Sequence, residues 1–125
     1  MRVNADAMTL YAVTDRTWVK DTTLMDQVKE ALEGGITFLQ LREKHLSKEA
    51  REMKELSKEY KVPFVINDNI EVALAVDADG VHIGQDDMSV EEARKLLGED
   101  KIIGVSAHNV EEAIKAQKGG ADYLG

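Results

Sequence analysis

Two aspartates, Asp68 and Asp87, each stand just after a short β-prone segment of this 125-residue chain. If the two segments are neighbouring parallel strands, the loops that carry the aspartates lie side by side at the carboxyl edge of the sheet. Two carboxylates, completed by water and by substrate phosphate oxygens, form a common protein site for Mg²⁺. Each aspartate also lies near a predicted helix start, where an acidic side chain can cap the helix. Taken alone, the two residues favour capping, and the adjacent Asp86 is typical of a solvated acid.

The segment 38–44 carries an amide and two cations at strand spacing. Side chains alternate across a strand, so Gln40 and Arg42 share one face, and Lys44 joins them if the extended conformation continues. Arginine binds phosphate through forked hydrogen bonds and lysine acts as a mobile point charge, so the pair suits a diphosphate. The alternative is an exposed loop in which the cations pair with Glu43. Gln40 favours the binding interpretation, because an amide inside an apolar strand needs a hydrogen-bond partner.

Smaller polar groups and two glycines stand in or beside the same strand ends. Asn67 either donates to a phosphate group or forms a turn, and Ser106 is a small donor or a capping residue. His82 is interpreted as a hydrogen-bonded interior residue, because no second histidine stands at metal-ligand spacing. Gly84 and Gly104 either leave room for a flat ring or allow close backbone packing. No pattern in the sequence indicates a nucleophile or a catalytic acid or base.

One unit recurs along the chain: a strand, a polar loop, an amphipathic helix and a turn into the next strand. Short apolar, β-branched segments predict the strands, and apolar residues at helical spacing predict the helices. The predicted strands cover 8–14, 36–42, 63–66, 80–83, 102–105 and a sixth from 121, and the helices cover 23–33, 47–60, 69–76, 89–97 and 109–118. The last helix is predicted to bury Val110, Ala113, Ile114 and Ala116.

Successive crossovers of this kind build a parallel sheet with helices outside it. The sheet is either an open, doubly wound one of about this length or an eight-stranded barrel, which needs roughly 200 residues or more. The repeating unit fits both. Because the sequence stops within a sixth strand that has no helix to cover it, we expect a barrel cut short.

Composition argues against several classes of function. The 24 acidic and 16 basic residues give a net charge of -8, which argues against a protein that binds nucleic-acid phosphates. The absence of cysteine rules out disulfides and thiolate metal sites. No apolar stretch approaches the length of a membrane span, and residues 1–7 are not typical of a secretory signal. We therefore expect a cytoplasmic protein without a membrane partner.

Six motifs follow one another along essentially the whole chain, at 10–15, 40–44, 66–68, 80–87, 104–108 and 120–125. In their order and spacing they resemble the motifs of the thiamine-phosphate synthase family. Each is weak alone, but six in sequence are specific. The resemblance implies an α/β fold, a parallel (β/α)₈ barrel of the TIM type. Residues 1–125 would form its amino-terminal part, an incomplete barrel of five to six strands and five helices.

The family joins 4-amino-5-hydroxymethyl-2-methylpyrimidine diphosphate to a thiazole phosphate, and the resemblance implies that activity here. Diphosphate departs first and the thiazole nitrogen captures the pyrimidine methylene cation, so no protein nucleophile is needed. The resemblance also implies that Asp68 and Asp87 bind Mg²⁺, which puts the metal interpretation ahead of capping. The substrate-binding residues that it implies are Gln40, Leu41, Arg42, Glu43, Lys44, Asn67 and Ser106.

The family pattern continues beyond Gly125 with a Thr- and Lys-bearing loop and a glycine-rich site for the thiazole phosphate. We therefore expect a fragment with little synthase activity alone, whose unclosed barrel favours self-association. Three alternatives stay open: a related thiazole tautomerase, a non-catalytic half-barrel that binds magnesium and diphosphate, and a flavodoxin-like signalling domain. Asp68, Asp87 and the segment 40–44 argue against the tautomerase. The cationic segment has no role in a signalling domain of that kind.

Overall fold

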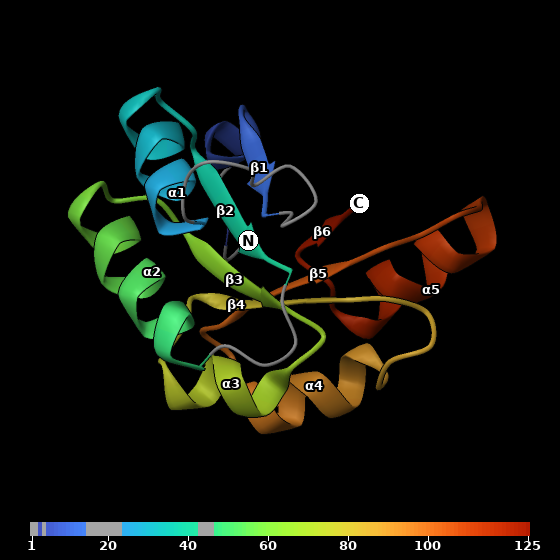
Figure 1. Ribbon diagram of the computed structural model, residues 1–125. Helices are drawn as coiled ribbons and strands as arrows, with labels where there is room; N and C mark the ends of the chain where they lie inside the picture. Colours follow the sequence, from blue (N-terminus) through green and yellow to red (C-terminus); the bar gives the residue numbers. More distant parts are fainter. Residues whose placement is uncertain (1–2, 4, 15–23, 43–46) are drawn as a thin grey trace.

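The strands form one parallel sheet that curls. The computed structural model describes residues 3, 5–14, 24–42 and 47–125. Its six strands pair in chain order, each parallel to the next. They are β1 (Tyr11–Val13), β2 (Phe38–Leu41), β3 (Phe64–Asn67), β4 (Gly80–Ile83), β5 (Ile102–Val105) and β6 (Tyr123–Leu124). The hydroxyl oxygens of Tyr11 and Tyr123, on the two edge strands, are 2.6 Å apart, so the sheet curves into part of a barrel (Figure 1). The predicted incomplete parallel barrel is confirmed.

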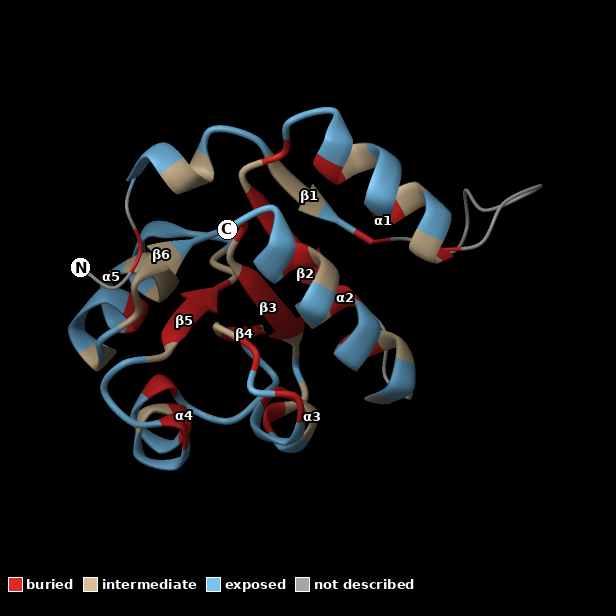
Figure 2. Cartoon of the chain, turned by 90° about the vertical axis from the view of Figure 1, so that its left-hand side faces the viewer, coloured by how far each residue is buried: buried red, intermediate tan, exposed pale blue. Residues whose placement is uncertain are grey.

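Five α-helices lie outside the curved sheet and turn their buried sides toward it (Figure 2). They are α1 (Leu24–Glu33), α2 (Ser47–Glu59), α3 (Ile70–Ala75), α4 (Val90–Leu97) and α5 (Val110–Gly119), and a short 3-10 helix η1 (Ala5–Met8) precedes β1. The predicted alternation of strand and helix is therefore confirmed over the described residues. Within those residues, no helix combines the length and the apolar character that crossing a membrane requires.

Side chains fix where three helices begin. Asn69 caps α3, Ser89 caps α4 and Asn109 caps α5, each by accepting a hydrogen bond from the backbone N–H three residues further on. Such a bond satisfies one of the N–H groups that the first helical turn leaves without a partner. At the other end of α5, Gly120 adopts a left-handed conformation with φ of 102°, which a residue without a side chain adopts readily.

Both faces of the inner strands, β2 to β5, are largely buried, and β2 shows how the alternation of side chains divides the two faces. Leu39 and Leu41 belong to the large core between the sheet and the helices. Phe38 belongs to a smaller core inside the curl, and Gln40 lies on the same inner face and lines the cleft described below. Burial on both sides explains why the strands are nearly continuous apolar segments. The inner face is therefore where a buried polar side chain stands out.

The first strand is shorter than predicted, because side-chain hydrogen bonds hold the segment before it in a turn. Thr9 Oγ1 donates to the carbonyl of Asp6 at 2.7 Å, and Thr37 Oγ1 donates to the carbonyl of Ala7 at 2.8 Å. Hydroxyl groups that bind nearby carbonyls in this way compete with an extended backbone. Regular pairing with β2 accordingly starts at Tyr11.

The prediction for the buried side of α5 is wrong in two of its four positions. Ala116 is buried and Ala113 is partly buried, but Val110 is 73% exposed and Ile114 is 46% exposed. The apolar stripe is present in the sequence, but the described elements leave that part of the helix surface uncovered. Helical spacing identifies an apolar face without showing what covers it.

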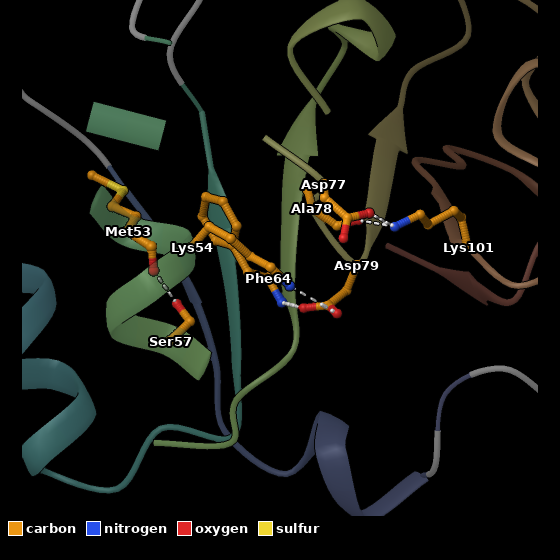
Figure 3. Close-up of polar contacts among 8 residues, drawn as sticks. All are labelled: Met53, Lys54, Ser57, Phe64, Asp77, Ala78, Asp79 and Lys101. Carbon is orange, nitrogen blue, oxygen red and sulfur yellow. Dashed lines mark hydrogen bonds and ion pairs between the residues drawn. The ribbon is translucent and has the colours of Figure 1, made fainter. Parts of the chain in front are cut away.

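Polar contacts tie the strands together at their amino-terminal ends (Figure 3). Asp79, just before β4, accepts a hydrogen bond from the Phe64 N–H at 2.7 Å and pairs with Lys54 at 3.4 Å. Lys101, just before β5, donates to the Ala78 carbonyl at 2.8 Å. These contacts set the strand positions from the end opposite to the polar loops, which stay available for binding.

Candidate functional site

The carboxyl ends of the strands open onto a cleft of about 860 Å³. Each strand, or the loop directly after it, contributes a polar side chain to the cleft. In strand order these are Tyr11, Gln40, Asn67, His82, Ser106 and Tyr123. Parallel strands bring their carboxyl ends to one edge, and the curl brings those ends around a common space. The predicted convergence of polar strand ends is therefore confirmed.

Asp68 and Asp87 both line this cleft. Asp68 follows β3 with φ of 65°, and its backbone N–H donates to the His82 carbonyl on β4 at 2.9 Å. The carboxylate of Asp87 accepts a hydrogen bond from the Gly84 N–H at 2.7 Å, which folds the loop after β4 back on its strand. The two acids thus reach one cleft from neighbouring strands, as the sequence predicted.

The helix caps next to these aspartates are other residues. Asn69 caps α3 and Ser89 caps α4, so the capping interpretation of Asp68 and Asp87 is wrong. Among the described residues, no group of three or more His, Asp or Glu side chains is placed to hold a metal ion. Two carboxylates beside a cleft fit Mg²⁺, which commonly takes one or two protein carboxylates and fills its other positions with water and phosphate oxygens.

Gln40 finds two side-chain partners on the inner face of the sheet. Its Nε2 donates to the Tyr11 hydroxyl at 2.6 Å, and its Oε1 accepts from Asn67 Nδ2 at 3.0 Å. Gln40 is 4% exposed, so an unpaired amide there would be costly. The sequence predicted that this amide needs a partner, and the structure identifies one on each neighbouring strand.

Of the other residues in the predicted diphosphate-binding segment, Arg42 lines the cleft and Leu41 does not. Arg42 is exposed and lines the cleft, and its backbone N–H donates to Thr14 Oγ1 at 2.9 Å. Leu41 packs in the core between the sheet and the helices, so its side chain faces away from the cleft. Glu43 and Lys44 lie outside the described residues, and their predicted roles stay predictions.

Ser106 lines the cleft and lies within hydrogen-bond distance of His82. The Oγ atom of Ser106 lies 2.8 Å from His82 Nε2, and His82 Nδ1 lies 2.9 Å from the Tyr123 hydroxyl. His82 is 7% exposed, so the interpretation of it as a hydrogen-bonded interior residue is confirmed. The sequence alone assigned no role at the site to Tyr11 or Tyr123. The pairing of Tyr11 with Phe38 in the sheet places Tyr11 on the inner face.

A flat ring does lie against Gly104, and it belongs to the protein. A Cβ atom on Gly104 would lie 2.1 Å from Cζ of Tyr123, far inside van der Waals contact. The Tyr123 ring also packs edge-on against Phe38, with ring centres 5.5 Å apart. Gly104 therefore makes room for a side chain of the chain itself, which is a third possibility beside the two that the sequence offered.

Burial keeps the ring groups of the cleft uncharged near neutral pH. Burial raises the pKa of the Tyr11 hydroxyl, against the effect of its hydrogen bonds to Tyr123 and Gln40. Burial also raises the pKa of Tyr123. It lowers the pKa of His82, while the negative charge of Asp87 acts in the opposite direction. The hydroxyls thus retain their protons, and a neutral imidazole has one donor and one acceptor nitrogen.

Two further side chains at the cleft were not assigned from the sequence. Gln85 Nε2 donates to the Ser106 carbonyl at 2.7 Å, which connects the loops after β4 and β5. His108 Nδ1 lies 3.2 Å from Glu112 Oε1, one helical turn along in the sequence. The signal for the second pair is the spacing of four residues, which brings side chains together at a helix start.

Comparison with known proteins gives consistent results along the chain. Residues 10–125 match the family model described as thiamine monophosphate synthase. The chain is 53% identical over 121 residues to the thiamine-phosphate synthase of Clostridium acetobutylicum, covering 93% of this chain and 57% of that protein. It is 51% identical over 121 residues to the thiamine-phosphate synthase of Shouchella clausii, covering 93% of this chain and 58% of the relative.

The fold is similar to that of a solved structure, thiamine phosphate pyrophosphorylase from Pyrococcus furiosus. The two superpose with a TM-score of 0.87 at 41% sequence identity, over 95% of this chain and 59% of the other. The chain therefore spans less than two thirds of the length of the relatives that it matches.

Proposed function

This chain belongs to the thiamine monophosphate synthase family, and from that premise we propose that its cleft binds a pyrimidine diphosphate together with Mg²⁺. The reaction proposed for the whole enzyme couples 4-amino-5-hydroxymethyl-2-methylpyrimidine diphosphate to a thiazole phosphate, giving thiamine phosphate and diphosphate. The observation that carries the proposal is the presence of Asp68, Asp87 and Arg42 on one cleft at the carboxyl ends of the strands.

Asp68 and Asp87 would hold the metal in this proposal. Support comes from their shared cleft, and from the assignment of the neighbouring helix caps to Asn69 and Ser89. When bound, Mg²⁺ supplies charge stabilisation to the departing diphosphate oxygens. The two carboxylates would also balance part of the positive charge of the metal.

Arg42 would contact the diphosphate from the mouth of the cleft, because its side chain is exposed and lines that space. The proposed step breaks the bond between the pyrimidine methylene carbon and a diphosphate oxygen, and the thiazole nitrogen forms the new bond to that carbon. Both electrons of the broken bond leave with diphosphate. Such a step needs positioned cations and a site shielded from water, and it uses no protein nucleophile.

The proposal for this chain is narrower than that for the whole enzyme. Since the chain covers 57% to 59% of its relatives, we expect it to bind the pyrimidine diphosphate and to turn over slowly or not at all by itself. A non-catalytic half-barrel that binds magnesium and diphosphate would show the same binding, so the coupling reaction has to be measured separately. A biosynthetic function on small molecules fits the cytoplasmic location that the composition predicts.

Calorimetric titration of the chain with the pyrimidine diphosphate tests the proposal. We expect saturable binding that depends on Mg²⁺ and weakens roughly tenfold or more in Asp68→Asn and in Asp87→Asn, because each removes a metal-binding charge. Asp100→Asn, an exposed acid at the opposite end of the sheet, is the matched control and should bind like the unaltered chain. Binding that is unchanged by chelation of Mg²⁺ would contradict the metal assignment.

A coupling assay with both substrates then separates the candidate functions. Thiamine phosphate formation by the chain at an ordinary enzyme rate would contradict the expectation of little activity. Binding without magnesium dependence, together with conversion of a thiazole isomer, would favour the tautomerase instead.

A further inference from the structure

One continuous series of hydrogen bonds crosses the inner face of the curved sheet and links residues that lie in, or directly after, each of the six strands. It runs from Asn67 to Gln40 (3.0 Å), to Tyr11 (2.6 Å), to Tyr123 (2.6 Å), to His82 (2.9 Å) and to Ser106 (2.8 Å). The family resemblance implies substrate contacts for the two amides and the serine, at the ends of this series. It leaves the three ring side chains in the middle without a role.

The orientation of the Gln40 amide, with Nε2 toward Tyr11 and Oε1 toward Asn67, sets the direction of the hydrogen bonds. Gln40 Nε2 is an amide nitrogen, which donates hydrogen bonds but cannot accept them. The Tyr11 oxygen therefore accepts from it. The Tyr11 hydroxyl hydrogen then needs an acceptor, and the Tyr123 oxygen lies 2.6 Å away. If Tyr123 instead donated to Tyr11, the hydrogen of this partly buried Tyr11 hydroxyl would lose the partner that the structure offers it, at a cost in free energy.

The same order continues to the serine. Tyr123 donates to His82 Nδ1, so a neutral His82 carries its hydrogen on Nε2 and donates it to Ser106 Oγ. Ser106 thereby accepts from His82, and its own hydroxyl hydrogen is free to point into the cleft that it lines. An Nδ1 atom that accepts a hydrogen bond carries no hydrogen, so the order of the bonds itself requires a neutral His82 ring.

Ring packing holds the middle of the series in place. Tyr11 stacks on Phe38 with ring centres 4.7 Å apart, and Tyr123 packs against both of these rings. The missing side chain of Gly104 admits the Tyr123 ring to this position. Packed rings hold the hydroxyl oxygens at hydrogen-bond distance from one another, so the series itself is a property of the fold.

We propose that Tyr11, Tyr123 and His82 are positioning residues that hold Ser106 as a hydrogen-bond donor toward an acceptor atom of the bound pyrimidine diphosphate. The identity of the ligand rests on the proposed function. The order of the hydrogen bonds rests on the geometry of the chain alone. Two experiments therefore address the two parts separately.

Long-range ¹H–¹⁵N NMR of the histidine side chains tests the order of the bonds in the unliganded chain. His82→Gln identifies the His82 signals by their loss. We expect His82 to be neutral, with hydrogen on Nε2 and none on Nδ1. Tyr123→Phe keeps the ring but removes the donor to Nδ1, so the variant should show a mixture of the two tautomers. Tyr60→Phe, on the surface after α2, is the matched control and should leave the signals unchanged. Hydrogen on Nδ1 in the unaltered chain would overturn the proposal.

Titration with the pyrimidine diphosphate and Mg²⁺ tests the donor role of Ser106. Loss of one hydrogen bond should weaken binding about two- to tenfold in Ser106→Ala, and by a similar factor in Tyr123→Phe. Because Tyr123 acts through Ser106, the double variant should bind no more weakly than Ser106→Ala. Independent losses that multiply in the double variant would overturn the positioning role. If the unaltered chain does not bind at all, the result contradicts both the proposed function and the proposed ligand of Ser106. The NMR result still decides the hydrogen-bond order in that case.

Discussion

Gly104 shows how one missing side chain arranges the floor of the cleft. Its position on β5 faces Tyr123 on β6, and the tyrosine ring occupies the space that a Cβ atom would need. That ring carries the hydroxyl between Tyr11 and His82. The glycine therefore influences hydrogen bonds that it does not itself make.

We expect Gly104→Ala to destabilise the chain by about 1–3 kcal/mol, because the Tyr123 ring has to move out of a packed interior. The same shift should break the contact between Tyr123 and His82 and weaken ligand binding. Urea unfolding measures the first effect and calorimetric titration the second. Gly84→Ala is a control for stability, since the nearest atom to its Cβ would be the Asp87 carboxylate at 3.3 Å. Equal stability of the two variants would contradict this account.

At the scale of elements, one type of hydrogen bond, from a backbone N–H to a side-chain oxygen, recurs before every second strand. Thr37 before β2, Asp79 before β4 and Asp122 before β6 each accept a hydrogen bond from a backbone N–H that lies within one residue of the start of the preceding strand. The donors belong to Leu10, Phe64 and Ile103. Each bond satisfies a strand-end N–H that the next strand cannot reach, and ties two neighbouring strands at the end opposite the cleft.

Arg94 adds further polar contacts to the hydrogen bond that Asp122 makes before β6. Its guanidinium pairs with the Asp122 carboxylate at 2.9 Å and donates to the carbonyls of Lys101 and Gly120. The pair is largely buried, with side-chain exposures of 12% and 4%. A buried carboxylate of this kind requires its partner, so Arg94 and Asp122 act as one unit that joins α4 to the last two strands.

We expect Asp79→Ala to cost about 1–3 kcal/mol of unfolding free energy, because the N–H of the buried Phe64 loses its acceptor. Asp79→Asn keeps an oxygen acceptor and should recover much of that loss. Asp77→Ala is the matched control: its side chain is 84% exposed, and its pairing with Lys101 contributes less than about 1 kcal/mol. Urea unfolding of the three variants gives the comparison, and an equal loss in Asp77→Ala and Asp79→Ala would contradict it.

At the scale of the whole molecule, the curved sheet has two edge strands. In the described residues, β1 and β6 each pair with one neighbour, and their hydrogen-bonding edges do not pair with each other. Apolar side chains at these edges are exposed: Leu10 by 50%, Val13 by 46% and Leu124 by 45%. Uncovered edge strands with apolar side chains favour pairing with another chain.

We expect the chain to self-associate in a concentration-dependent manner through these edges. Light scattering coupled to size-exclusion chromatography should give a mass that rises with concentration. Val13→Lys places a charge on the β1 edge and should shift the mass toward that of the monomer. A monomer at all concentrations would contradict the prediction. Leu96→Lys, an exposed apolar residue on α4, tests whether any added charge has the same effect.

Local patterns in the sequence predicted the elements and the edge at which chemistry is expected. The apolar segments identified six strands, helical spacing identified five helices, and Asn69, Ser89 and Asn109 were identified at helix starts. These features depend on interactions between residues that are a few positions apart, so the order of the residues is enough to predict them. Strand alternation likewise predicted that Gln40 and Arg42 share one face, and both residues line the cleft.

The partners of those side chains depend on the curl of the sheet. Tyr11 and Tyr123 are 112 residues apart in sequence, and their hydroxyls meet because twist and stagger accumulate over six paired strands. The sequence accordingly identified Gln40 as an amide in need of a partner, whereas the tertiary structure determined that the partners are Tyr11 and Asn67. It also determined that Gly104 accommodates a tyrosine of the chain. The spacing of residues along the sequence does not predict the curvature of the sheet, and these contacts depend on that curvature.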